Sequence, residues 1–132
     1  MTMLPLARAV LSAALATLLS AGTPAVASPV ALTNGDHGRA VVVHPGDRIT
    51  VRLVSVREGG VRYDWDTPTA AAPEVLHRSE GATDPRGSSR AVFTAAQDGS
   101  SAVTAHRRCT VVEPGALCSH AVVLWQVTIT AE

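Results

Sequence analysis

The sequence predicts an all-β fold, an immunoglobulin-like antiparallel β-sandwich of about seven strands, on three observations. Apolar and polar residues alternate with a period of two along most of the chain after Pro29, as in strands with one buried face. Gly- and Pro-containing turn formers separate these stretches at short intervals. The chain after Pro29 shows no helical apolar period. Short strands at this spacing favour a sandwich or a small barrel, and we expect the sandwich.

The first 27 residues predict a cleaved signal peptide rather than part of the fold. Arg8 precedes an apolar run at Ala9–Leu19, and small residues up to Ala27 form the expected cleavage site. The run is shorter than the roughly 20 residues that a membrane-spanning helix needs. We therefore expect a secreted, extracellular protein whose mature chain has no membrane span and consists of one domain at residues 28–132.

Strand-like stretches follow one another from Pro29 to the end of the chain, the first of them as an edge strand. In "RITVRLV", for example, Ile49, Val51 and Leu53 share one face. The expected strands lie at residues 29–33, 38–43, 48–55, 61–66, 74–77, 90–95, 101–107 and 119–130.

Turn and loop signals lie between these strands. The stretches "HPGD", "EGG", "QDGS" and "EPGA" are turn formers, since Gly supplies positive φ and Pro fixes φ near −65°. Pro68 and Pro73 flank three alanines, which favours a loop over a helix there. The polar, glycine-containing stretch Arg78–Ser89 predicts a mobile loop.

All four aromatic residues, Tyr63, Trp65, Phe93 and Trp125, fall on the inward faces of the expected strands. We predict that they form the core. An alternative for Tyr63 or Trp65 is a position near a strand end, where the ring would shape a binding surface.

The two cysteines, Cys109 and Cys118, bracket a turn-containing loop, and His106 and His120 lie close to them. The spacing differs from the usual structural zinc patterns. An even number of cysteines in a secreted protein pairs by default. We predict a Cys109–Cys118 disulfide across the mouth of a hairpin, with no metal site and no cofactor. Extracellular metal binding through His106 and His120 remains the alternative.

Catalytic motifs are absent from the sequence. It contains no G-x-S-x-G, no H-E-x-x-H and no phosphate-binding glycine loop. Asp64 and Asp66 share a strand face at about 6–7 Å, a separation that could suit a glycosidase, but alternating charge on a solvent-facing strand is far commoner. The formal net charge is zero, which excludes a basic field for nucleic acid. We expect a non-enzymatic protein.

The order of features resembles the chagasin-like inhibitors of papain-type cysteine proteases. The stretches "AVVVHPGDRITVRL", "YDW", "AVFTAAQDGSSAVTAHRR" and "WQVTITAE" are similar to that family's opening strands, aromatic-x-Trp strand, Phe strand with its hairpin, and closing strand. The family's loop motifs Asn-Pro-Thr-Thr-Gly and Arg-Pro-Trp are replaced by "EGGVR" and "RRC". The frame with a C-terminal cysteine pair is also similar to small secreted actinobacterial proteins.

The resemblance implies an immunoglobulin-like scaffold that binds a protein partner, a papain-like cysteine protease, through three loops at one end. The loops would be Ser55–Val61, Gly81–Ser89 and Arg107–Cys118, on a protein expected to be a monomer. A structural or adhesive cell-envelope domain with no protease target is the alternative. The candidate binding residues are Arg57, Glu58, Gly59, Gly60, Arg62, Arg86, Gly87, Arg107, Arg108 and Pro114.

Overall fold

The computed structural model describes Met3 and residues 29–132, so the expected signal peptide lies, apart from Met3, outside the described residues. Within the described part, no helix has the length and apolar character needed to cross a membrane. The elements are β1 (Pro29–Leu32), the 3₁₀ helix η1 (Asn34–Asp36), β2 (Ala40–Val43), β3 (Arg48–Leu53), β4 (Val56–Glu58), β5 (Val61–Trp65), β6 (Thr69–Ala70), β7 (Leu76–Thr83), β8 (Ser89–Ala95), β9 (Gly99–Val111) and β10 (Val123–Ala131).

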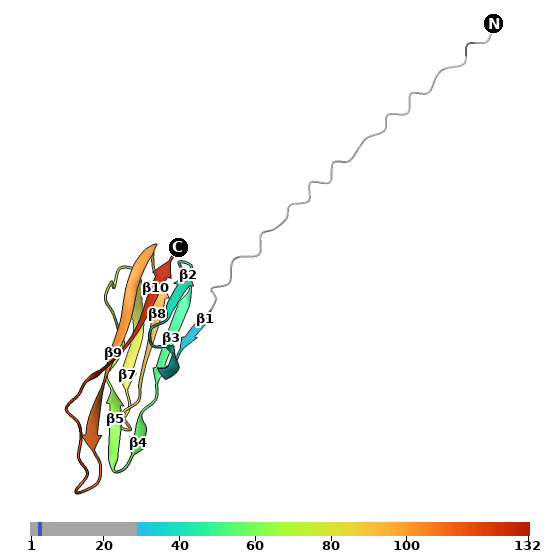
Figure 1. Cartoon of the computed structure of the whole chain (residues 1–132). Helices are drawn as coiled ribbons and strands as arrows, with labels where there is room; N and C mark the ends of the chain where they lie inside the picture. Colours follow the sequence, from blue (N-terminus) through green and yellow to red (C-terminus); the bar gives the residue numbers. More distant parts are fainter. Residues whose placement is uncertain (1–2, 4–28) are drawn as a thin grey trace.

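The strands form two sheets that pack face to face, as the immunoglobulin-like prediction requires (Figure 1). One sheet has the order β1-β3-β8-β7, and the other has the order β2-β10-β9-β5-β4, with β6 pairing to β9. Most neighbours are antiparallel, as predicted. The pairs β1–β3 and β2–β10 are parallel instead. β1 and β2 are edge strands of the two sheets, and the chain passes from one to the other through η1.

The alternating apolar residues meet between the sheets. Phe93 and Trp125 are fully buried, and Trp65 is 6% exposed, which confirms the predicted core for three of the four aromatics. The Trp125 indole donates a hydrogen bond to the Thr33 carbonyl at 3.1 Å, so this buried N–H has an acceptor. Tyr63, the fourth, is only half-buried.

The prediction of a mobile loop at residues 78–89 is wrong. Strand β7 continues to Thr83, and a short turn leads into β8. In this turn the Asp84 carboxylate accepts hydrogen bonds from the amides of Arg86 and Ser88, at 2.8 and 3.1 Å. The strand was missed because β7 is a sheet edge whose residues after Leu76 are all exposed, so its sequence has no apolar alternation.

Four further elements, β4, β6, β9 and β10, differ from those expected. The predicted loop 55–61 contains β4, which forms a hairpin with β5. Gly59 and Gly60 connect these strands with φ of 56° and 81°, as a type I′ turn requires. Strand β9 is longer than predicted, and β10 begins at Val123 instead of 119. The short strand β6 lies within the loop expected between Pro68 and Pro73.

Candidate functional site

The three loops expected to bind a partner lie at one end of the sandwich, opposite the C-terminus (Figure 1). They contact one another directly. The Ser55 amide of the first loop donates to Ser88 Oγ of the second at 2.9 Å. Arg57 of the first loop forms an ion pair of 2.9 Å with Glu113 of the third. The three connections therefore form one connected surface.

The loops do not end at the same level, because one sheet extends beyond the other. The Trp65 indole donates to the Val54 carbonyl at 3.2 Å, just past the last residue of β3. Strands β5 and β9 stay paired from Trp65–Arg107 out to Val61–Val111. Four residues at about 3.3 Å each give a protrusion of roughly 13 Å. We call residues 56–64 and 108–118 the extension.

The second loop lies at the base of this extension. The amide of Trp65 donates to the Gly87 carbonyl at 2.8 Å. Gly87 has a φ of 87°, and a Cβ there would overlap the Asp64 carboxylate. Its smallness therefore lets the second loop pack against β5. Gly87 is buried, so it shapes the loop and presents no side-chain surface.

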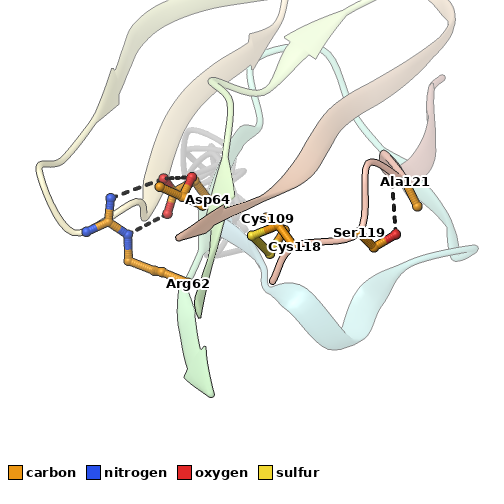
Figure 2. The surroundings of a disulfide bond; sticks show 7 residues. Arg62, Asp64, Cys109, Cys118, Ser119 and Ala121 are labelled. Atoms are coloured by element: carbon orange, nitrogen blue, oxygen red, sulfur yellow. Dashed lines mark hydrogen bonds and ion pairs between the residues drawn. A yellow bond between two sulfur atoms is a disulfide. The ribbon is translucent and has the colours of Figure 1, made fainter. Parts of the chain in front are cut away.

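The third loop is held against the extension by a disulfide and by the β4–β5 turn. Cys109 and Cys118 are bonded, with their Cα atoms 5.5 Å apart, as predicted (Figure 2). The amides of Val112 and Glu113 donate to the Gly60 carbonyl at 3.0 and 3.1 Å. We call residues 112–118 the stapled segment. Its side chain at Leu117 is 91% exposed, and sequence reasoning did not select it.

Gly60 is the buried contact point between this segment and the hairpin. A Cβ at Gly60 would lie 3.1 Å from the Cβ of Ala116, tighter than ordinary packing. Pro114 and Gly115, with a φ of 83° at the glycine, form the turn that brings Ala116 back to this point. Pro114 and Gly59 are exposed and remain candidates for direct contact with a partner.

Arg62, another candidate, is bound within the extension. Its Nε and Nη2 donate to the two Asp64 carboxylate oxygens at 2.6 and 3.1 Å (Figure 2). Thr110 Oγ1 also donates to this carboxylate, at 2.9 Å. The Arg62 hydrogen bonds, and then that from Thr110, hold the pKa of Asp64 below its ordinary value, although desolvation opposes them. The hydrogen bonds among Arg62, Asp64 and Thr110 therefore link β5 to β9 on the solvent-facing side of the extension.

Replacing Asp64 by asparagine should lower the free energy of unfolding at neutral pH. It should also make that free energy depend less steeply on pH in the acid range. A carboxyl whose pKa is lower in the folded state stabilises that state above its unfolded pKa of about 3.9. This stabilisation is lost as the pH falls through the lowered pKa of Asp64. Urea unfolding of both proteins between pH 7 and pH 2 measures the difference in free energy, which should shrink toward the acid end. A difference that is constant with pH would contradict this assignment.

Asp66 has partners of its own, separate from those of Asp64. Asp66 accepts a hydrogen bond of 2.7 Å from the His106 amide. It also lies 3.2 Å from His106 Nδ1 and 3.7 Å from Arg108 Nη1. The described residues contain no group of three or more His, Cys, Asp or Glu that could hold a metal ion, and both cysteines are in the disulfide.

Arg107 and Arg108 lie on opposite faces of β9. Arg108 is exposed on the face with Asp64 and Asp66. The Arg107 guanidinium lies 4.8 Å from the centroid of the Tyr63 ring and 5.7 Å from that of Trp65, within the range of cation–π attraction. This stacking was not predicted, because it requires the register between β5 and β9. Arg57, Glu58 and Arg86 are exposed.

Comparisons with known proteins identify the fold. No family model matches the chain, and no curated protein matches it. Among solved structures, the cysteine protease inhibitor EhICP2 from Entamoeba histolytica superposes with a TM-score of 0.51 at 11% identity, over 79% of this chain and 95% of that one. Amebosin gives a TM-score of 0.46 at 11% identity, over 80% and 99%. The inclusion body protein PixA from Burkholderia cenocepacia gives 0.45 at 13%, over 69% and 59%.

The likeness to the Entamoeba inhibitor is one of fold. It confirms the scaffold that the resemblance to the chagasin-like inhibitors implies.

Proposed function

We propose that this protein is a non-enzymatic, secreted binding domain that inhibits papain-type cysteine proteases with its extension. The observation that carries the proposal is the stapled segment, which is fixed at both ends and presents Leu117 to solvent. The fold, shared with a cysteine protease inhibitor, supports this role. The disulfide fits an oxidising, extracellular compartment.

Inhibition by this geometry requires only that the extension fill the protease cleft. Because the disulfide and the Gly60 carbonyl already hold the stapled segment, little conformational entropy is lost on docking. Leu117 and Pro114 would enter the cleft. The exposed side chains around them, Arg57, Glu58, Arg86 and Arg108, would contact its rim. The family's loop motifs are replaced here, so these contacts would be specific to this chain.

Titration of papain and of a cathepsin-like protease with the purified protein tests the proposal. We expect stoichiometric inhibition, and an inhibition constant at least about tenfold higher for Leu117→Asp, since a buried leucine contributes roughly 1.5–3 kcal/mol. Val42→Asp is the matched control, because Val42 is 61% exposed on β2, outside the three loops. It should inhibit like the unmodified protein.

Absence of inhibition at micromolar excess would mean that the likeness to the inhibitors is one of fold only. Retention of the protein on cell-wall material would then favour the structural or adhesive envelope domain.

A further inference from the structure

The extension has one face that continues the core side of its sheet. Directly paired residues of neighbouring strands point to the same face. Trp65 points into the core, and it is paired with Arg107, which is paired with Val123. One step further out, Tyr63 is paired with Val56 on one side and with Cys109 on the other. This face of the extension, with Val56, Tyr63 and the disulfide, adjoins Arg107 and Val123 at the base of the extension. We call the surface of these residues the ledge.

The facing sheet does not cover the ledge. That sheet ends at the pair Leu53–Ser89, level with Trp65. Val56 is 48% exposed and Val123 is 42% exposed. The reverse face is polar, and Figure 2 shows Arg62 and Asp64 on the opposite side of β5 from the disulfide. The extension is therefore amphipathic. Its apolar face is only partly covered: Val61 is buried, Val56, Val111 and Val123 are about half exposed, and the exposed Glu58 lies at the outer end of this face.

Arg107 puts a positive charge on this face that stacks on the Tyr63 and Trp65 rings. Its Nε–H is buried and has no acceptor among the described residues. The nearby carboxylates are paired with other groups: Asp64 with Arg62, Asp66 with His106 and Arg108, and Glu113 with Arg57. A guanidinium does not lose its proton. A carboxylate bound to its Nη groups would form charge-assisted hydrogen bonds with the same guanidinium in surroundings of low polarity, while Nε stays buried.

We propose that the ledge docks an extended segment of a protein partner, which places an Asp or Glu carboxylate on Arg107 and an aliphatic side chain on each of Val56 and Val123. Val56 and Val123 lie on β4 and β10, which are separated by three strand spacings, about 14 Å, and Val56 lies two residues further out along the strands, so the two Cα atoms are about 16 Å apart. In an extended segment, residues i and i+4 share a face at about 13 Å, with residue i+2 between them, and the side chains at i and i+4 would extend outward to cover the remaining distance of about 3 Å. The pattern that fits is aliphatic-x-acidic-x-aliphatic.

One feature of the sequence restricts the occupant further. Residues 1–28 contain no Asp or Glu, so the chain's own N-terminal segment cannot supply the carboxylate. The segment need not belong to a protease, and this inference stands or falls separately from protease inhibition.

The test is an NMR titration of the ¹⁵N-labelled protein with the blocked peptide Val-Ser-Glu-Ser-Val and, in parallel, Val-Ser-Gln-Ser-Val. We expect saturable shifts at the amides of Val56, Tyr63, Arg107 and Val123 with the Glu peptide. The Gln peptide should bind at least about tenfold more weakly, because it loses a charge-assisted hydrogen bond. Arg107→Gln should abolish this discrimination. Arg108→Gln, the neighbouring arginine on the opposite face, should leave it unchanged.

Equal binding of the two peptides, shifts outside the ledge, or no saturable shift up to millimolar peptide would overturn the proposal. Val123→Ser provides a second variant should Arg107→Gln unfold, and it should weaken both peptides without changing their ratio. A further outcome is a shift of the ledge amides without peptide, as the protein concentration rises and a dimer forms. That result would assign the ledge to a second copy of this chain and would also overturn the proposal.

Discussion

Replacing Trp65 by alanine is expected to lower the free energy of unfolding by about 3–5 kcal/mol, as large-to-small changes of buried tryptophan do. Trp65 is 6% exposed and belongs to the core cluster. Its indole N–H also donates to the Val54 carbonyl at 3.2 Å, and its ring lies beneath Arg107. The substitution would therefore remove core volume at the point where the extension leaves the sandwich.

Chemical denaturation of the two proteins measures this loss. Phe93→Ala is the matched control, because Phe93 is fully buried in β8 and is not part of the extension. Both variants should be destabilised to a similar degree, but only Trp65→Ala should increase amide exchange at Tyr63 and Cys109 by local opening of the extension. A Trp65→Ala protein with less than about 1 kcal/mol of destabilisation would contradict the role assigned to the ring.

The sheet arrangement follows from the sequence where one strand face is buried and fails where it is not. Ile49, Val51 and Leu53 are all fully buried, as their alternation predicts. Strand β7 has a solvent-exposed edge and a polar sequence, so its extended conformation is set by pairing to β8. Pairing between strands is a tertiary property, and local pattern does not encode it.

The sequence predicts the turn type and the disulfide of the loops better than it predicts how far the loops protrude from the sandwich. The Gly59–Gly60 turn and the disulfide follow from residue types and compartment. The protrusion of the extension depends instead on where β3 ends relative to β5, which no single segment specifies. Alternation placed Tyr63 on the inward face, but the facing sheet stops before it, so the ring is half-buried and stacks with Arg107.

Replacing both cysteines by serine should lower the free energy of unfolding by about 2–3 kcal/mol, since the bond closes a loop of ten residues in the unfolded chain. The effect on the stapled segment should be larger than the effect on the fold. In the part of the chain that the structure describes, no backbone hydrogen bond joins residues 117–122 to another element. The disulfide therefore fixes the position of Leu117, while the strands on either side keep their own ladder bonds.

This difference separates stability from function in one experiment. At a temperature well below unfolding, the Cys109→Ser/Cys118→Ser protein should keep its strand spectrum by circular dichroism, because the core residues are untouched. Its inhibition of papain should weaken at least about tenfold, since the segment must be ordered again on docking at a cost of roughly 1 kcal/mol or more per residue. Treating the unmodified protein with a thiol reductant is the matched control and should give the same loss. Inhibition that survives both changes would show that the extension binds through β4 and β5 alone, and the contact surface would then shift from Leu117 to Arg57, Glu58 and Gly59.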